Sequence, residues 1–190
     1  MPKYTLDNFK VDTSNELAYA VAEAVTKKPL SYNPVFLYGK SGSGKTHLLR
    51  AIENEIKKFD SESSVLYMTC ESLVSDSFSI IHSAQQRDWF SFLKEKYKIY
   101  TTLIVDDVCY LRNKPETQRT IADFFCWFWS GGRQLVFSSS CKPEFLPLIS
   151  RRVEYGSESS FITETDWRKD SRDTMVGFAD RPTGRQALPL

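Results

Sequence analysis

The sequence predicts an α/β domain with a central parallel sheet and helices on both faces. Short apolar runs at residues 35–38, 65–69, 102–105 and 134–138 alternate with segments of helical periodicity. The run 102–105, Thr-Leu-Ile-Val, has the apolar character of a buried parallel strand. A glycine-rich turn joins the first run to a helical segment, and in parallel sheets such turns lie at the ligand-binding edge.

Length and composition describe an ordinary soluble domain. The 190 residues (21.9 kDa) suffice for one core, and 26% charged with 41% hydrophobic residues is typical of globular proteins. The formal net charge of +1 gives no global basic field, so contact with nucleic acid would need a local patch. The start MPKYTLDNF is polar, and no run approaches the ~20 apolar residues of a membrane span. We expect a cytoplasmic protein with no membrane partner.

Four cysteines, Cys70, Cys109, Cys126 and Cys141, lie far apart with no CxxC spacing, and His47 and His82 are the only histidines. This is too little for an ordinary closed zinc site unless the histidines join distant cysteines. We expect buried free thiols, as in a reducing compartment.

Before the first strand, residues 4–11 form a mixed segment in which Phe9 and Val11 are the expected anchors. The T-x-x-E pattern of Thr13–Glu16 predicts a capping box and a helix start. The residues that then recur at helical spacing are Leu17, Val21, Ala24 and Val25. Lys27-Lys28 and Pro29 predict the end of this helix.

Further helices are expected between the strands. Residues 46–58 should pack on the sheet through one apolar face: Leu48, Leu49, Ile52 and Ile56. Two helical pieces follow at about 71–82 and 86–97, marked by Leu73, Phe78, Ile81, Trp89, Phe90 and Leu93. Pro115 opens another helix that ends at Gly131-Gly132; its aromatic residues 124–129 form either a core face or an interface patch. Phe161-Ile162 could be a last short strand and 166–176 a weak helix, before an irregular end at 179–190.

The turn Gly39–Thr46, GKSGSGKT, matches the phosphate-binding P-loop pattern in sequence and in context, because a strand precedes it and a helix follows. The glycines let backbone N–H groups point inward at phosphate oxygens, and the helix start adds its positive dipole end. Lys45 would reach the β- and γ-phosphates, and the Thr46 hydroxyl would bind Mg²⁺. The alternative is a flexible Gly/Ser loop ending in a capping threonine.

Two aspartates end the third strand, and they form the second half of the predicted site. Asp106 and Asp107 after four apolar residues match the Walker B pattern, in which the first carboxylate holds Mg²⁺ and the second orients an attacking water. Strand-end aspartates can also be helix caps. The P-loop about sixty residues upstream favours the site, because both motifs serve one metal-bound triphosphate.

Two further polar groups are candidates. Ser138–Ser140 end the fourth strand, where they could sense the γ-phosphate or the attacking water, or make local turns. Arg151-Arg152 follow on a short loop after residues 147–150. An arginine there could act as a finger on the nucleotide of a neighbouring subunit, or be simply solvated.

Four segments together indicate a family: YTLDNFKVDTSNELAYA, YNPVFLYGKSGSGKTHLLRAIENEI, LIVDDVCYL and RQLVFSSSCKP. Over about Tyr4 to Gly156, the chain resembles the AAA+ ATPase domain of the bacterial replication initiator DnaA and its sister helicase loaders and regulators. The Asn-Pro before the strand, Thr-His-Leu-Leu after the lysine and the Asp-Asp form of Walker B are its specific features. The resemblance implies a three-layer P-loop NTPase fold of the AAA+ class.

The resemblance also implies roles for single residues. ATP (or ADP) would be bound by the P-loop and the residue after it: Gly39, Lys40, Ser41, Gly42, Ser43, Gly44, Lys45, Thr46 and His47. Mg²⁺ would be held by Thr46 and Asp106. Asp107 would be the hydrolytic carboxylate, Ser140 would take the sensor position and Arg151 would be the finger. Lys94, Lys96 and Lys98 fall where initiators contact single-stranded DNA, although a solvated helix face explains them as well.

The sequence departs from the family at three places. Ser140 stands where initiators have an aspartate, Arg152 replaces an aromatic residue, and we expect the helical lid to be truncated or absent. We therefore expect an ATP-binding domain at 1–160 and a partial lid or irregular tail at 161–190. Without a helix-turn-helix domain, sequence-specific duplex recognition is not expected.

The resemblance thus implies an ATP-binding protein that acts in initiation or regulation of DNA replication through ATP-dependent assembly. Its partners would be itself or a full-length DnaA-type initiator, with single-stranded DNA and a replicative helicase as further candidates. Hydrolysis would be slow, because Asp107 reaches one bond length (~1.5 Å) less far than a glutamate. The alternatives are a helicase-loader-like adaptor in which ATP is a structural switch, and a small-molecule kinase, which the lack of an arginine-rich lid disfavours.

Overall fold

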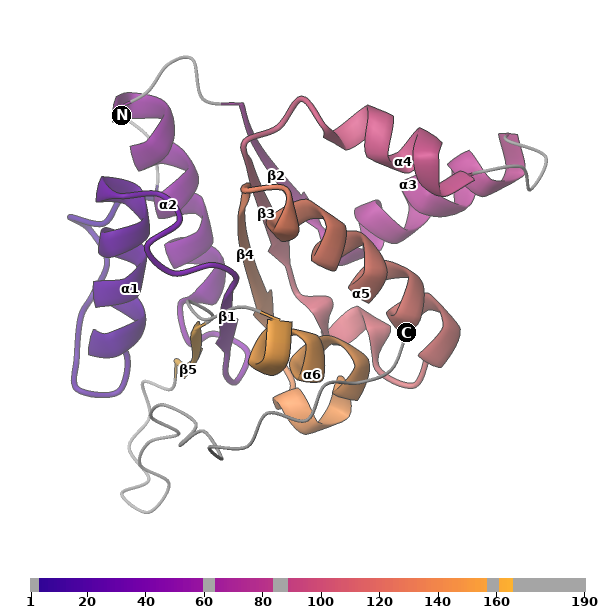
Figure 1. The fold of residues 1–190 in the computed structure, drawn as a ribbon. Helices are drawn as coiled ribbons and strands as arrows, with labels where there is room; N and C mark the ends of the chain where they lie inside the picture. Colours follow the sequence, from indigo (N-terminus) through magenta and orange to yellow (C-terminus); the bar gives the residue numbers. More distant parts are fainter. Residues whose placement is uncertain (1–3, 60–63, 84–88, 157–160, 166–190) are drawn as a thin grey trace.

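The computed structural model describes residues 4–59, 64–83, 89–156 and 161–165, which form a three-layer α/β sandwich (Figure 1). Five parallel strands make the sheet in the order β2-β3-β4-β1-β5. Their bounds are β1 Val35–Tyr38, β2 Val65–Thr69, β3 Thr102–Asp106, β4 Gln134–Ser139 and β5 Phe161–Glu164. The predicted fold class is confirmed, and so is the short last strand.

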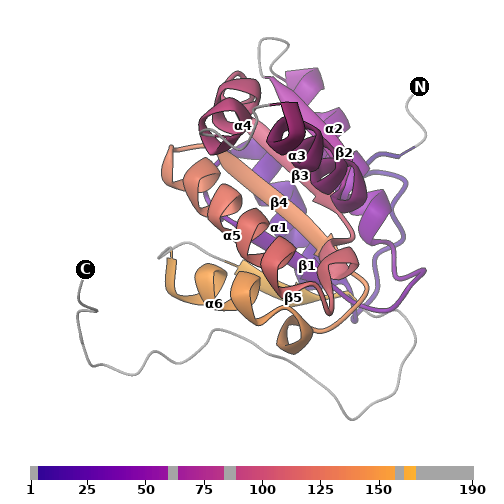
Figure 2. The ribbon, with the colours of Figure 1, turned by 90° about the vertical axis from the view of Figure 1, so that its right-hand side faces the viewer.

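Helices cover both faces of the sheet. Helices α1 (Glu16–Lys27) and α2 (Lys45–Phe59) lie on one face. The other carries α3 (Cys70–Ser83), α4 (Trp89–Tyr97), α5 (Pro115–Ser130) and α6 (Pro147–Gly156). The view in Figure 2 shows α5 crossing the sheet between α4 and α6. Two short 3₁₀ turns, η1 (Val108–Leu111) and η2 (Pro143–Phe145), follow β3 and β4.

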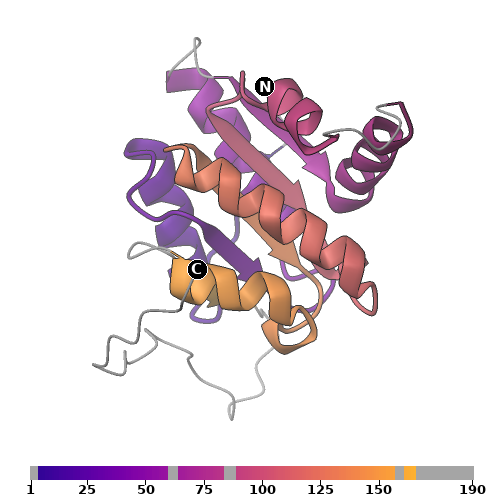
Figure 3. The ribbon, with the colours of Figure 1, turned by 45° about the vertical axis from the view of Figure 1, so that its right-hand side comes forward.

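The register brings the carboxyl ends of the central strands to one edge. Tyr38 of β1 lies opposite Ser139 of β4, and Thr69 of β2 lies opposite Asp106 of β3. All strand arrows in Figure 3 run the same way, so the turns after β1, β3 and β4 gather at the edge where ligands bind in such sheets. Every residue of these three strands is buried, which explains their nearly continuous apolar sequences.

The packing of α1 and α2 on the sheet confirms the buried face predicted for α2 and corrects the one predicted for α1. Leu48, Leu49, Ile52 and Ile56 are buried, as expected. On α1, however, Leu17 is 47% exposed, and the buried face is made mainly of smaller residues: Ala18, Val21, Ala22 and Val25. The predicted anchor Val11 is also exposed, whereas Leu6 is buried and Phe9 packs against this core.

The predicted capping box of Thr13 does not form. Helix α1 begins at Glu16 with Asn15 as N-cap, and Asn15 makes no side-chain cap bond. Its amide oxygen instead accepts from the Asp12 N–H at 2.9 Å, and Asp12 accepts from the Ser14 N–H at 2.8 Å. These local Asx bonds hold the turn before the helix, and the Ser14 bonds lower the pKa of Asp12.

On the opposite face of the sheet, the structure shows whether the aromatic residues 124–129 of α5 form a core face or an interface patch. Phe124, Phe125 and Phe128 are fully buried, and Phe125 stacks on Phe137 of β4 at 5.2 Å between ring centroids. Full burial of such a side chain stabilises the fold by about 1.5–3 kcal/mol. The cluster is therefore mainly a core face. On α3, Leu73 is buried as predicted, but Phe78 is 47% exposed.

Helix α6 corrects one prediction. Arg151-Arg152 were predicted on a short loop after residues 147–150, but a helix begins at Pro147 and carries both arginines. Proline fits the first turn of a helix, because its missing N–H would have no intrahelical partner there. The predicted weak helix at 166–176 and the tail at 179–190 lie outside the described residues.

All four cysteines are free thiols, as predicted, but only Cys70 is fully buried. Burial and nearby Asp107 raise the pKa of Cys70 to about 12. Burial and a hydrogen bond with Cys109 raise the pKa of Cys141 to about 11.

Among the described residues no histidine, cysteine and carboxylate cluster could hold a metal ion. Within that same part of the chain, no helix has the length and apolarity needed to span a bilayer.

Candidate nucleotide-binding site

The turn between β1 and α2 has the backbone that the P-loop pattern requires. Gly44 has φ of +90°, a conformation that L side chains rarely adopt, and a Cβ atom there would lie 2.8 Å from the Phe9 ring. A Cβ on Gly39 would lie 2.2 Å from the Thr165 carbonyl oxygen. Thr165 also meets the Ser43 hydroxyl at 2.9 Å. The turn is therefore packed on both sides by segments distant in sequence.

Lys45 begins the 15-residue helix α2, and its side chain folds back over the turn. The ammonium group donates to the carbonyl oxygens of Gly39 at 2.6 Å and Lys40 at 2.8 Å. The residue is only 7% exposed. A buried ammonium beside the N–H groups of a helix start suits an anionic ligand such as a phosphate.

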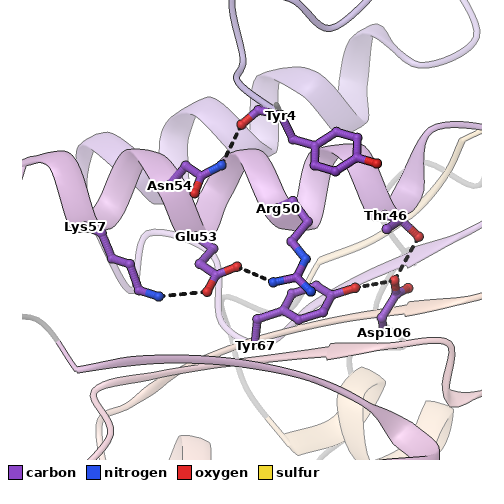
Figure 4. A network of polar contacts seen from close by, with 8 residues as sticks. All are labelled: Tyr4, Thr46, Arg50, Glu53, Asn54, Lys57, Tyr67 and Asp106. Atoms are coloured by element: carbon purple, nitrogen blue, oxygen red, sulfur yellow. Dashed lines mark hydrogen bonds and ion pairs between the residues drawn. The ribbon is translucent and has the colours of Figure 1, made fainter. Parts of the chain in front are cut away.

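Thr46 and Asp106 join the two predicted motifs. The Thr46 hydroxyl donates to Oδ2 of Asp106 at 2.8 Å, and the Asp106 side chain is buried at the end of β3 (Figure 4). Hydroxyl and carboxylate oxygens are the ligands that Mg²⁺ prefers, usually with phosphate oxygens and waters completing the octahedron. The donor set at this contact therefore fits a nucleotide-bound Mg²⁺.

Asp106 has two more partners, which the sequence reading did not identify. The Tyr67 hydroxyl donates to Oδ2 at 2.6 Å, and the Ser138 hydroxyl donates to Oδ1 at 2.5 Å. Burial and the bond to Asp106 raise the pKa of Tyr67, which keeps the phenol protonated and able to donate. The only sequence signal was position: Tyr67 stands near the end of a strand beside the acidic one.

Asp107 and Ser140 are also brought together. Asp107 has φ of +54°, and its Oδ1 accepts from the Ser140 N–H at 2.9 Å and hydroxyl at 2.8 Å. Its own N–H donates to the Ser138 hydroxyl at 3.0 Å. Both Asp107 and Ser140 are exposed at the carboxyl edge of the sheet. The predicted hydrolytic carboxylate and the predicted sensor are thus direct partners.

Two other predicted residues face elsewhere. The His47 ring nitrogen Nε2 lies 3.0 Å from the Thr5 carbonyl oxygen and 2.9 Å from Oδ1 of Asn8, so the ring binds the N-terminal segment. Arg151 is exposed on α6 and makes no hydrogen bond or ion pair with the other described residues.

The lysines proposed for single-stranded DNA are largely engaged within the chain. Lys96 pairs with Asp76 and Lys98 with Glu95, each at 2.5 Å, and Lys94 lies 4.4 Å from the Phe90 ring centroid. These contacts favour a solvated helix face over a prepared phosphate site.

The site combines a glycine-rich turn, a buried lysine and a hydrogen bond from Thr46 to the acidic end of β3. These features lie on a parallel sheet with the order β2-β3-β4-β1-β5. Together they define a P-loop NTPase of the AAA+ class. Comparison with known families makes this specific. The model of the family described as the bacterial DnaA ATPase domain matches residues 1–163, and the chain belongs to this family.

Individual relatives agree with that membership. The chromosomal replication initiator protein DnaA of Caldanaerobacter subterraneus is 33% identical over 164 residues, which are 86% of this chain but 36% of that protein. Domain III of the Thermotoga maritima replication initiation protein DnaA superposes with a TM-score of 0.75 at 30% identity, covering 87% of this chain and 68% of that one.

Two more structures bear on the site and the fold. A replication initiator DnaA bound to AMPPCP and single-stranded DNA has a TM-score of 0.69 at 31% identity, covering 88% of this chain and 51% of that one. The DnaC helicase loader has a TM-score of 0.66 at 15% identity, covering 85% and 96%, which shows a shared fold alone. Measured against the full-length initiator proteins that it matches, such as the Caldanaerobacter protein, this chain spans about a third of their length.

Proposed function

We propose that this chain binds ATP with Mg²⁺ and acts as a DnaA-type module in the initiation or regulation of DNA replication. One observation carries the proposal: the Thr46 hydroxyl meets the Asp106 carboxylate at 2.8 Å, directly beside the lysine-bearing turn. The nucleotide would lie along Gly39–Thr46, with Thr46 and Asp106 on the metal. A relative at 31% identity that is bound to AMPPCP, an ATP analogue, supports the ligand class.

The module would work by assembly. ATP-bound copies would associate with one another or with a full-length DnaA-type initiator, with single-stranded DNA and a replicative helicase as further partners. Exposed Arg151 would reach the nucleotide of a neighbouring subunit and stabilise charge in the transition state. The ATP-binding domain would comprise 1–160, and 161–190 would be a partial lid or irregular tail whose first residues, β5, pair with β1 of the sheet.

Hydrolysis would be slow. Asp107 would orient the attacking water, and Ser140 holds this carboxylate through two hydrogen bonds. An aspartate reaches less far than a glutamate, and the arginine would come from another subunit. The alternative is an adaptor in which ATP is a structural switch; the solvent exposure of Asp107 favours this role if no neighbour covers it.

Calorimetry and sedimentation test the proposal together. We expect the protein to bind ATP and ADP in the presence of Mg²⁺, and to form larger species with ATP as its concentration rises but to stay monomeric with ADP. Arg151→Ala should bind ATP with unchanged affinity and fail to raise hydrolysis on assembly. Absence of nucleotide binding would overturn the proposal, and a monomer in both nucleotides would leave only the adaptor role.

A further inference from the structure

Tyr67 reaches the metal-site carboxylate from a neighbouring strand. Its hydroxyl donates to Oδ2 of Asp106 at 2.6 Å, the same oxygen that accepts from Thr46 at 2.8 Å. Ser138 donates to the other oxygen, Oδ1, at 2.5 Å. Both carboxylate oxygens are thus fixed, by hydroxyl groups from α2, β2 and β4, as Figure 4 shows for the first two.

Arg50 in turn holds Tyr67. Its guanidinium carbon lies 3.3 Å from the centroid of the Tyr67 ring, close enough for a cation–π contact. Arg50 also donates to Glu53 at 2.8 Å, and Lys57 donates to Glu53 at 2.7 Å (Figure 4). Helix α2 therefore supplies both the Thr46 hydroxyl and the side chain that fixes the tyrosine over Asp106.

We propose that Tyr67 is a positioning residue that orients the Asp106 carboxylate toward Thr46 for the metal, and that Arg50 keeps Tyr67 in place. This inference rests on the proposed function. Hydrogen-bond donors behind a metal-binding carboxylate set its orientation, and their loss typically costs 10–100-fold in metal affinity. Tyr67 shares this supporting role with Ser138, so its loss should fall near the lower end of that range.

The chain contains a matched control. Tyr97 donates its hydroxyl to Oδ2 of Asp76 at 2.8 Å, the same phenol-to-aspartate bond, between α4 and α3. Tyr97 is 1% exposed, so removing its hydroxyl perturbs the fold at least as much as at half-buried Tyr67. Tyr97→Phe therefore separates loss of a buried hydrogen bond from loss of the metal-site bond.

The test measures ATP affinity with Mg²⁺ and with EDTA for each protein, and takes the ratio as the Mg²⁺ enhancement. We expect Tyr67→Phe to lower this enhancement about tenfold while the affinity without Mg²⁺ stays within about twofold. Arg50→Met, which keeps the phenol, should lower it about threefold. Tyr97→Phe should leave the enhancement at the wild-type value, and thermal unfolding confirms that each variant folds.

The outcomes separate the two proposals. An enhancement in Tyr67→Phe equal to that of the wild type overturns the positioning role. So does an equal loss of affinity with and without Mg²⁺, because a structural defect would act on both. If the wild-type protein itself binds no ATP, the proposed function fails; if it binds with a clear enhancement that Tyr67→Phe retains, only this inference fails.

Discussion

The two neighbouring aspartates divide the candidate site into halves that are held in different ways. Asp106 is 8% exposed and accepts from three hydroxyl groups that come from α2, β2 and β4. Asp107, one residue later, is exposed, and its side chain accepts only from Ser140 among the described residues. Consecutive side chains leave a strand on opposite faces, and the left-handed φ of Asp107 turns the chain away from the sheet.

This difference indicates that nucleotide binding and hydrolysis depend on separate parts of the site. The half proposed to bind phosphate and metal comes from one chain, and hydrogen bonds within that chain hold Lys45, Thr46 and Asp106. The half proposed for hydrolysis is open to solvent, and Arg151 stands on a separate helix. Such a division fits a domain that binds nucleotide alone and hydrolyses it only when another subunit covers the open side.

The largest effect is expected in the binding half. Lys45→Ala removes a buried ammonium and its charge-assisted contact to phosphate, a contact worth about 1.5–3 kcal/mol. ATP affinity should fall at least ~10-fold, and up to about 150-fold, in calorimetric titrations. Lys58→Ala is the control, since Lys58 is an exposed residue at the far end of the same helix. Wild-type affinity in Lys45→Ala would refute the placement of the nucleotide.

A substitution in the solvent-exposed half, at Asp107, should change the rate of ATP hydrolysis and leave the ATP affinity unchanged. Asp107→Asn keeps an oxygen that can accept from Ser140, so we expect the fold and the ATP affinity to stay within about twofold. Orienting and activating the attacking water typically contributes 10²–10⁴-fold, so single-turnover hydrolysis should fall at least ~100-fold. Asp123→Asn, on α5, serves as the carboxylate control. Parent-rate hydrolysis in Asp107→Asn would remove this residue from the proposed reaction.

The binding half was also the more predictable from sequence. The P-loop turn and the Asp106-Asp107 strand end are contiguous patterns whose spacing encodes their backbone, and the apolar run Leu103–Val105 of β3 indicates a buried parallel strand. Tyr67 could not be found in this way. Its contact with Asp106 depends on how two strands 39 residues apart in sequence lie side by side, and no local pattern encodes that.

The structure corrects two predictions about the helices. Arg151 was predicted to lie on a loop, but it lies on α6, and Pro147 suits the first turn of that helix. On α1 the prediction placed Leu17 on the buried face because of its helical spacing. The structure leaves Leu17 exposed and buries Ala18 and Ala22 in the core cluster that α1 shares with α2.

The smallest effect is expected from the contact between Ser140 and Asp107, the two exposed residues of the half proposed for hydrolysis. Ser140→Ala removes the hydroxyl bond of 2.8 Å to Asp107 but keeps the backbone N–H bond of 2.9 Å to the same oxygen. One such bond is worth about 1 kcal/mol, so hydrolysis should slow about fivefold at most, with unchanged ATP affinity. Ser79→Ala, which loses a hydroxyl bond within α3, is the matched control. A loss as large as that of Asp107→Asn would show that Ser140 itself contacts the reacting groups, and no loss would show that the backbone bond alone positions the carboxylate.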